Sequence, residues 1–314
     1  MSKKKSPAIF IIGPTASGKT SLAIKLKEYF PLELISVDSA LVYKGMNIGT
    51  AKPTEEELRL APHRLISFLD PSKPYSAAEF RKDALREMQE ITANGKIPVL
   101  VGGTMLYFRA LEYGLAKLPS ANQLIREKLL EQANQNGWVY LHDRLKEVDP
   151  VSAQRIHPND KQRIQRALEV YELTGKALTV HQKEAQKDAL PYRLMKIALI
   201  PESREWIREL AAVRFKQMLD NGLIEEVQSL YSRGDLSSDL PAMRSVGYRQ
   251  VWEYLEGKTT YAEMTELAII ATRQLAKRQM TWMRSEKKIS SYNAKEYNFS
   301  KILKDVEIFL EDTV

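Results

Sequence analysis

The chain has 314 residues, 44% of them hydrophobic, and its 47 Lys and Arg residues against 40 Asp and Glu residues give a formal net charge of +7. This composition excludes a wholly disordered chain, and the length predicts about two domains. The absence of cysteine excludes disulfides, thiol nucleophiles and Cys-ligated zinc or iron–sulfur sites, and the four histidines are scattered rather than clustered.

Hydrophobic stretches are short throughout the sequence. No apolar run approaches the roughly 18 residues of a membrane helix, and the basic residues 3–5 are followed by only five apolar residues, at 8–12. This pattern predicts a cytoplasmic protein without a signal peptide or membrane contact.

The positive charge is spread thinly along the chain. Residues 1–114 carry 16 basic and 12 acidic side chains, residues 115–195 carry 13 and 10, and residues 196–314 carry 18 and 18. Because only clustered charge indicates nucleic acid binding, the net charge alone favours an ordinary mixed surface.

The first third of the chain alternates two kinds of segment. Short apolar runs predict strands at 8–12, 32–37 and 97–101, and helical segments lie at 20–30 and 76–94. This alternation is typical of a parallel sheet with helices on its faces, whose ligands gather at the carboxyl ends of the strands. We therefore expect Asp38 and Thr104, which follow the second and third strands, beside the loop after the first.

From about residue 115 the pattern becomes helical. Stops at 136–137, 149–150 and 174–175 separate predicted helices at 122–135, 139–148, 150–156 and 160–173. A strand predicted at 193–200 returns the chain to the sheet, and further helices are predicted at 203–221, 224–232, 243–256, 261–284 and 300–311. The helical block is therefore predicted to be an insertion in the α/β core.

Residues 13–20 read GPTASGKT, a complete G-x-x-x-x-G-K-[ST] phosphate-binding loop between a predicted strand and a predicted helix. Consecutive backbone amides of such a loop surround a phosphate, while Lys19 supplies a positive charge and the Thr20 hydroxyl binds Mg²⁺. The predicted diphosphate-binding residues are Gly13, Pro14, Thr15, Ala16, Ser17, Gly18, Lys19 and Thr20. The predicted fold is α/β: a P-loop NTPase-like parallel sheet core with helices on both faces and an inserted all-helical domain.

The loop by itself leaves several reactions open. No Asn-Lys dipeptide occurs, so the guanine-reading motif of GTPases is missing. Asp38 ends a predicted strand and is suited to hold a metal ion, which keeps a small-molecule kinase among the alternatives. An ATP-gated RNA-binding module is the non-catalytic alternative.

Seven segments together make the chain resemble the bacterial tRNA dimethylallyltransferases, also called tRNA isopentenyltransferases. They are GPTASGKT at 13–20, DSALVYKGMNIGTAKP at 38–53, DPSKPYSAAEF at 70–80, VGGTMLY at 101–107, VRFKQML at 213–219, LPAMRSVGYRQ at 240–250 and TRQLAKRQMTWMR at 272–284. With no cysteine in the sequence, the zinc-finger extension of eukaryotic members is not expected, and Pro62-His63-Arg64 stands where a His-His pair is frequent.

This resemblance implies a monomeric, Mg²⁺-dependent enzyme. It would transfer the dimethylallyl group of dimethylallyl diphosphate to N6 of the adenosine on the 3′ side of the anticodon. The catalytic core would comprise residues 1–114 and 195–314, and the insertion at 115–194 would bind tRNA. A free adenine nucleotide is the alternative acceptor, which the helical insertion disfavours because a mononucleotide does not need it.

The resemblance also implies roles for single residues. The P-loop would hold the diphosphate as a leaving group, with Mg²⁺ on Thr20. Asp38 would be the general base, Arg214 would reach the diphosphate, and Thr104 would lie beside the reacting centre. The ordinary alternatives are helix caps for Asp38 and Thr104 and a surface charge for Arg214.

Two helical stripes of basic residues are candidates for tRNA contacts, although a solvated face is the commoner explanation of one stripe alone. Lys161, Arg163 and Arg166 share one helix with no acid between them, and Arg273, Lys277 and Arg284 share another. The tRNA-binding residues implied by the resemblance are Asp38, Ser39, Ala40, Leu41, Thr104, Gln162, Arg163, Ile164, Gln165, Arg166, Arg244, Tyr248, Arg249, Gln250, Arg273, Lys277, Arg278 and Arg284.

The acceptor base must reach the chemistry from a stacked anticodon loop. We expect it to flip into a channel between the core and the insertion, opposite the prenyl diphosphate. Tyr43, Met46 and Tyr107 are candidate apolar walls for the prenyl group, with plain core packing as the alternative.

Overall fold

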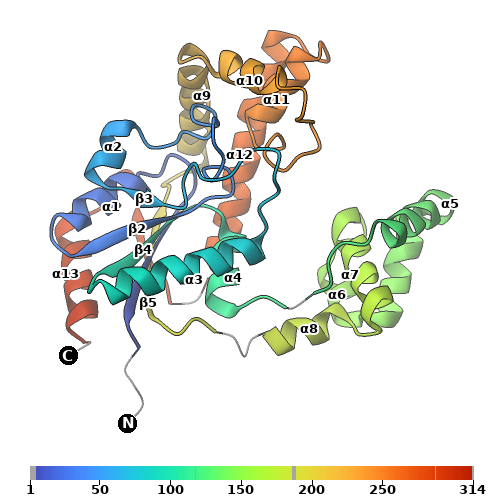
Figure 1. Ribbon diagram of the computed structural model, residues 1–314, viewed down its shortest axis with the longest axis horizontal. Coiled ribbons are helices and arrows are strands. Elements are labelled where there is room, and N and C mark those ends of the chain that lie inside the picture. The colour runs from blue at the N-terminus through green and yellow to red at the C-terminus, as the bar shows by residue number, and fades with distance from the viewer. Residues whose placement is uncertain (1–4, 117, 186–188, 287, 313–314) are drawn as a thin grey trace. The chain divides into compact units, whose positions relative to one another are not determined.

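The computed structural model describes residues 5–116, 118–185, 189–286 and 288–312. The chain forms two compact units, one made of Met1–Arg109 together with Pro191–Val314 and the other of Ala110–Leu190. Figure 1 traces the elements of each unit along the chain.

The first unit is built on a parallel sheet. In the described residues the strands lie in the order β3-β2-β4-β1-β5-β6, and every pair of neighbours is parallel. Their bounds are β1 (Pro7–Ile12), β2 (Leu32–Val37), β3 (His63–Arg64), β4 (Ile97–Gly102), β5 (Arg193–Ile200) and β6 (Ser290–Asn293). Because all the strands run the same way, the segments that follow β1, β2, β4 and β5 leave from one edge of the sheet.

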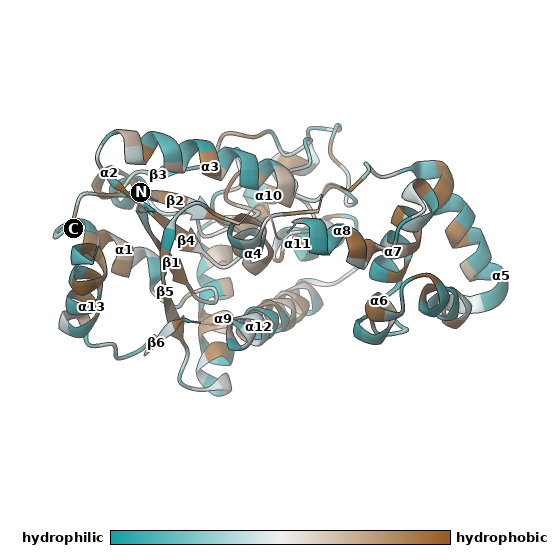
Figure 2. Cartoon of the chain, turned by 90° about the horizontal axis from the view of Figure 1, so that it is seen from below, coloured by the Kyte–Doolittle hydropathy of each residue, from teal (hydrophilic) through white to brown (hydrophobic). Residues whose placement is uncertain are grey.

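Helices cover both faces of this sheet, as the sequence predicts. Ile9 and Ile11 of β1 pack in one apolar cluster with α1 (Lys19–Lys27) and α13 (Phe299–Glu311). Phe10 projects to the opposite face, where its ring centroid lies 5.0 Å from that of Phe108 in α4 (Met105–Tyr113). Figure 2 shows the hydrophobic strands between these helices.

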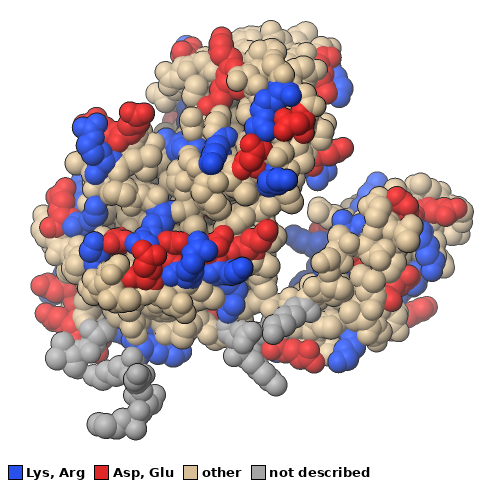
Figure 3. All heavy atoms as spheres, viewed as in Figure 1, with Lys and Arg blue, Asp and Glu red and all other residues tan. Residues whose placement is uncertain are grey.

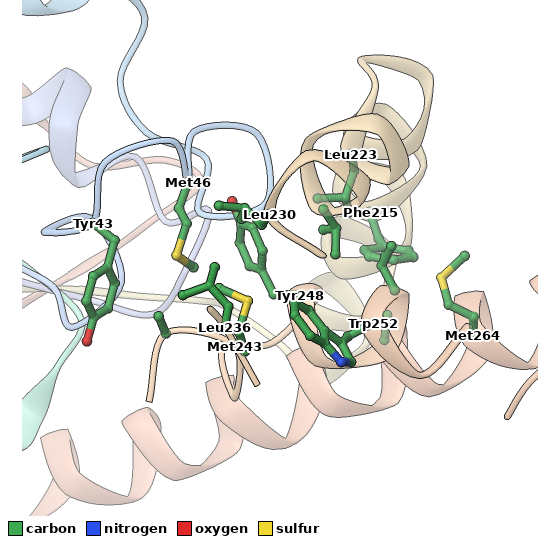
Figure 4. Packing of buried hydrophobic residues seen from close by; sticks show 14 of the residues in the cluster. Tyr43, Met46, Phe215, Leu223, Leu230, Leu236, Met243, Tyr248, Trp252 and Met264 are labelled. Atoms are coloured by element: carbon green, nitrogen blue, oxygen red, sulfur yellow. The ribbon is translucent and has the colours of Figure 1, made fainter. Parts of the chain in front are cut away.

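Beyond the sheet, a second apolar cluster joins the segment after β2 to four C-terminal helices (Figure 4). Tyr43 and Met46 come from that segment, and Phe215, Tyr248 and Trp252 come from the helices; all five are at most 4% exposed. The remaining helices of this unit are α2 (Glu55–Leu60), α3 (Ala77–Ala93), α9 (Arg204–Asp220), α10 (Leu223–Tyr231), α11 (Tyr248–Leu255) and α12 (Tyr261–Ser285).

The second unit consists of helices packed around their own apolar core. They are α5 (Gln123–Val148), α6 (Pro150–Arg155), α7 (Lys161–Thr174) and α8 (Leu178–Ala185). Gly137 has φ 84° and interrupts α5 at the stop that the sequence predicts. Leu141, Leu145 and Ile164 are fully buried in the core. The unit therefore has the packing of an independent small domain.

Several elements differ from the sequence prediction. The two edge strands β3 and β6 and the helices α2, α4 and α8 are additional, because segments this short carry little periodic signal. α11 begins at Tyr248 rather than at residue 243, because Gly247 has φ 93° and the residues before it form turns. This later start leaves residues 244–247 free to line a cavity.

The surface seen in Figure 3 carries both signs of charge side by side along α3. Arg64 makes ion pairs with Glu33 at 2.7 Å and with Glu87 at 2.8 Å, and Arg86 pairs with Asp83 at 2.9 Å. This face therefore has the mixed character that the low net charge predicts. None of the described helices has a stretch long and apolar enough to cross a bilayer.

Candidate active site

The phosphate-binding loop connects β1 directly to α1. Gly18 adopts φ 79° at the start of α1, a backbone conformation that favours glycine. The Ser17 hydroxyl and the Lys19 ammonium both donate to the carbonyl of Pro14, at 2.9 and 2.6 Å. A Cβ at Gly13 would lie 2.4 Å from Ser17 Oγ, so the loop closes tightly at this glycine. The sequence thus folds the loop into the compact turn that an anion site requires.

Asp38 and Thr104 follow the adjacent strands β2 and β4 and are brought together by the sheet. Asp38 Oδ1 accepts hydrogen bonds from the amides of Ala40 at 2.8 Å and Leu41 at 3.3 Å. Thr104 Oγ1 accepts one from the amide of Ser39 at 3.1 Å. Among the described residues Asp38 Oδ2 makes no hydrogen bond. The carboxylate is therefore held by one oxygen and has the other available.

Three charged groups meet at this edge with little solvent. Burial lowers the pKa of Lys19 to about 8, an effect that Asp38 opposes and Arg214 reinforces. Burial raises the pKa of Asp38, although the Ala40 and Leu41 amides and the nearby cations act against the shift. Burial likewise lowers the pKa of Arg214, with Asp38 opposing. Two cations facing one carboxylate leave a local excess of positive charge, which suits an anionic ligand.

Two cavities adjoin at these residues, and the first unit supplies every lining residue of both. One, of about 300 Å³, is lined by the P-loop residues 15–20 together with Asp38 and Arg214. The other, of about 420 Å³, is lined by Asp38, Thr104 and Arg214 together with apolar side chains of α9 and α12. Asp38 and Arg214 therefore stand between a phosphate-binding space and a more apolar one.

Two protein-family models match this chain. The model of the IPP transferase family matches residues 41–286, and that of the isopentenyl transferase family matches residues 7–70. The chain belongs to the IPP transferase family. This confirms the resemblance found in the sequence, and the enzyme is a prenyltransferase.

Solved structures of the family agree over the whole chain. A full-length tRNA isopentenylpyrophosphate transferase from Bacillus halodurans is 35% identical, with a TM-score of 0.71 over 99% of this chain and 97% of that one. A tRNA isopentenylpyrophosphate transferase from Staphylococcus epidermidis is 34% identical, with a TM-score of 0.70 over 99% and 100%. A eukaryotic dimethylallyltransferase acting on tRNA is 26% identical, with a TM-score of 0.81 over 98% and 80%.

The apolar wall of this prenyltransferase differs from the one that the sequence suggests. Tyr43, Met46 and Tyr107 line neither cavity and belong to the packing, where Tyr107 stacks on Phe80 with ring centroids 4.4 Å apart. The 420 Å³ cavity instead takes its apolar lining from α4, α9, α12 and the turn before α11: Met105, Leu106, Ala211, Phe215, Met218, Val246, Leu275 and Trp282.

A helical spacing could have revealed part of this wall. Ala211, Arg214, Phe215 and Met218 follow one another at intervals of three, one and three residues, which places them on one face of α9. Gln279 of α12 was also missed; its Nε2 donates to the carbonyl of Gly103 at 2.9 Å. A Cβ at Gly103 would lie 2.5 Å from that nitrogen, so glycine permits the contact.

The basic residues predicted on α12 separate into two groups. Arg278 lines the 420 Å³ cavity together with Gln279. Arg273, Lys277 and Arg284 line a separate cavity of about 730 Å³ between α9 and α12. Arg273, Lys277 and Arg284 therefore lie on a different surface of α12 from Arg278.

The residues predicted to contact tRNA in and next to α11 also differ in how far they are buried. Arg244 is exposed and lines the 420 Å³ cavity, and Arg249 is exposed. Tyr248 is 0% exposed and donates to Glu226, while Gln250 is 2% exposed and accepts from the amide of Gly247 at 2.9 Å. The structure thus contradicts direct RNA contact for Tyr248 and Gln250, whose polar atoms are used inside the chain.

The residues of the α7 segment KQRIQR, at 161–166, likewise differ in exposure and in their partners. Lys161, Gln162 and Arg163 are exposed, whereas Ile164 is fully buried in the helical core, which contradicts its predicted RNA contact. Gln165 donates to the carbonyl of Arg126 at 3.0 Å, and Arg166 forms a 2.6 Å ion pair with the buried Glu169. Gln165 and Arg166 therefore already have internal partners.

The residues directly after Asp38 lie around the cavities. Ser39 and Ala40 line the 420 Å³ cavity, and Leu41 lines the 300 Å³ cavity. Thr20, the residue predicted to bind a metal ion, lines the 300 Å³ cavity as well. No group of three or more His, Asp or Glu residues suited to a metal ion occurs in the described ranges.

Proposed function

We propose that this enzyme transfers the dimethylallyl group of dimethylallyl diphosphate to N6 of the adenosine on the 3′ side of the anticodon in tRNA, releasing diphosphate. The observation that supports this most strongly is the meeting of a P-loop cavity and an apolar cavity at Asp38 and Arg214. A donor on one side and an acceptor on the other would react at that junction. The solved relatives act on tRNA, as their descriptions state.

The diphosphate of the donor occupies the P-loop cavity. Amides of residues 15–20 surround it, the Lys19 ammonium moves from the Pro14 carbonyl to a phosphate oxygen, and Arg214 binds from the opposite wall. A guanidinium binds two oxygens at once and stabilises the negative charge that grows on the leaving group. The prenyl group extends past Arg214 toward Phe215 and Met218.

A magnesium ion fits the donors that this cavity offers. Mg²⁺ takes oxygen ligands, keeps several waters and is commonly held by substrate phosphates with one or two protein groups. The Thr20 hydroxyl would be the protein ligand, and the diphosphate would supply the anionic oxygens. When bound, the ion neutralises charge on the leaving diphosphate.

Asp38 is the general base. The acceptor N6 forms a bond to the terminal allylic carbon of the donor as the bond from that carbon to the diphosphate oxygen breaks, and one N6 proton passes to Asp38 Oδ2. The raised pKa of Asp38 brings its basicity closer to neutral pH, where proton transfer is more effective. Thr104 binds the amide of Ser39 and so keeps Asp38 at the junction.

The acceptor base reaches Asp38 by leaving the anticodon stack and entering the 420 Å³ cavity. Ser39, Ala40, Arg244 and Arg278 line this cavity and would contact the flipped nucleotide and its neighbours. Trp282 is an aromatic surface on which a base can stack.

Other basic groups are proposed to hold tRNA outside the cavity. On the helical unit these are Lys161 and Arg163, with Gln162 between them, and on the first unit they are Arg249 and the stripe Arg273, Lys277 and Arg284. We propose the helical insertion as the tRNA-binding domain for this reason. A tRNA acceptor is consistent with a cytoplasmic enzyme, and the family resemblance implies that it acts as a monomer.

The direct test is incubation of the purified protein with dimethylallyl diphosphate labelled in its prenyl group, Mg²⁺ and unmodified tRNA. Label should enter RNA, and digestion should recover it on N6 of a single adenosine together with an equal amount of diphosphate. A tRNA with guanosine in that position should stay unlabelled. ATP consumption without RNA labelling would instead favour a kinase, and labelling of free AMP in preference to tRNA would favour the nucleotide acceptor.

A further inference from the structure

The carboxylate of Glu226, on α10, is bound by three consecutive backbone amides of a distant turn. The Asn47 amide donates to Oε2 at 2.8 Å, the Ile48 amide donates to Oε2 at 2.9 Å, and the Gly49 amide donates to Oε1 at 3.2 Å. The Tyr248 hydroxyl donates to Oε1 as well. Successive amides of this kind form an anion-binding concavity, and here a side chain of the same protein fills it.

The turn that Glu226 binds forms part of the wall of the reaction cavities. Gly49 lines the 420 Å³ cavity, and Thr50 lines both that cavity and the P-loop cavity. Among the described residues, five border both spaces: Thr15, Asp38, Thr50, Gly103 and Arg214. Glu226 itself lines neither cavity.

The turn bound by Glu226 is closely packed, so a small displacement of the turn would disturb its contact with Glu226. A Cβ at Gly49 would lie 2.5 Å from Cε2 of Tyr248 and 2.8 Å from Cδ1 of Leu223, so the turn already touches α10 and α11. Lys52, at the end of the turn, donates to the carbonyl of Tyr43 at 2.9 Å and to Ser67 Oγ at 2.6 Å. The turn is thus fixed at its end by Lys52 and along its amides by Glu226.

We propose that Glu226 is a positioning residue for prenyl transfer: it holds the turn at residues 47–50 in the shape that the junction of the two cavities requires. The inference rests on the proposed function. Glu226 touches no reacting atom and acts through the backbone of Gly49 and Thr50. Arginine or lysine could not replace it, because only an acceptor satisfies three amides and a hydroxyl.

Glu226→Gln tests this role with a side chain of almost the same shape. The amide keeps one oxygen acceptor but presents an NH₂ group to donors that formerly met an oxygen, so at least one amide of the turn loses its partner. Glu225→Gln is the matched control, because Glu225 precedes it on α10 and is exposed. Tyr248→Phe is a milder variant that removes one donor and leaves the three amide contacts.

Hydrogen exchange followed by mass spectrometry measures directly how strongly the backbone amides of the turn are protected. In Glu226→Gln a peptide spanning residues 44–52 should exchange at least about tenfold faster, while peptides from β1 and β4 stay unchanged. The single-turnover rate of transfer should fall by about 10- to 100-fold, because small displacements at a reacting junction are costly. The dissociation constant for inorganic diphosphate and its binding stoichiometry should change less than about threefold, since the P-loop is untouched.

The outcomes separate the two proposals. Faster exchange in the turn with an unchanged transfer rate would overturn the positioning role, and so would equal losses in Glu225→Gln and Glu226→Gln. If Glu226→Gln does not fold, Tyr248→Phe decides: a rate loss of about three- to fivefold with full diphosphate binding supports the role, and an unchanged rate overturns it. Failure of the wild-type enzyme to label tRNA would instead contradict the proposed function, whatever the exchange data show.

Discussion

The phosphate-binding loop and the start of α7 are both contiguous sequence motifs, but they present their groups in different ways. The loop at residues 13–20 offers its backbone, so adjacent residues can act on one ligand. In α7 adjacent residues point in different directions: Arg163 is exposed, Ile164 is buried, and Arg166 pairs with Glu169.

This difference determines what a contiguous motif can mean. In a loop that uses main-chain amides, every position contributes to one site, and the glycines permit the path. On a helix only the residues of the outer face are available to a partner, and their neighbours stabilise the domain. Variants at the two regions should therefore differ both in size of effect and in kind.

The largest effect is expected at the loop. Lys19→Ala removes the cation proposed to face the diphosphate, and we expect kcat/KM for dimethylallyl diphosphate to fall by at least about 10²-fold. Lys25→Ala, on the exposed side of the same helix α1, is the control and should retain activity. Steady-state kinetics with saturating tRNA measures both. Equal activity of the two variants would remove the loop from the reaction.

The helix α7 should give two distinct results. Lys161→Ala combined with Arg163→Ala should raise KM for tRNA about tenfold and reduce the slope of log affinity against log salt by about 0.9 per lost phosphate contact. Arg166→Ala should instead lower the free energy of unfolding by about 2 kcal/mol, because Glu169 loses one of its partners inside the unit. Salt-dependent tRNA binding measures the effect of the double variant, and thermal unfolding measures the effect of Arg166→Ala. An unchanged salt slope in the double variant would show that this face does not meet RNA.

The pH dependence of the loop follows from its buried charges. Lys19, with a pKa of about 8 in the free enzyme, is charged below that pH, so the affinity for diphosphate should fall as pH rises through 8. Asp38 must be deprotonated to act, and its raised pKa means that kcat/KM should fall on acidification at a higher pH than for an ordinary aspartate. Titration of the enzyme with diphosphate from pH 6.5 to 9.5 measures the loss of affinity expected from Lys19. The same titration of Lys19→Met corrects for ionisation of the diphosphate itself. An identical pH dependence of diphosphate affinity in the wild-type enzyme and in Lys19→Met would contradict this role of Lys19.

The smallest effects should separate the two faces of α12. Arg278→Ala should reduce transfer to a short anticodon stem-loop by a few-fold, because Arg278 lines the cavity proposed to receive the base. Arg273→Ala, on the 730 Å³ cavity, should leave the stem-loop reaction within about twofold and act mainly on binding of full-length tRNA. Competition assays with the two RNAs compare them directly. Equal losses with both RNAs would place the two arginines on one surface.

The sequence predicts the sheet well, because buried parallel strands such as β1 and β2 are short apolar runs with clear boundaries. It also identifies Asp38 and Thr104, because the carboxyl ends of such strands share one edge. The site could not be completed in the same way. Phe215 and Gln279 come from helices far along the chain, and only tertiary packing brings them to the cavity. Glu226 carries no motif of its own, because its role depends on a turn 177 to 179 residues away.

The central claim is that Asp38 takes a proton at the junction of a donor cavity and an acceptor cavity. Its most direct test is the single-turnover rate of transfer in Asp38→Asn, measured with both substrates saturating, alongside the dissociation constants for tRNA and inorganic diphosphate. We expect the rate to fall by about 10²- to 10⁴-fold while both dissociation constants stay within a few-fold of the wild-type values. A rate close to that of the wild-type enzyme, or a loss of tRNA or diphosphate binding as large as the loss of rate, would contradict this account.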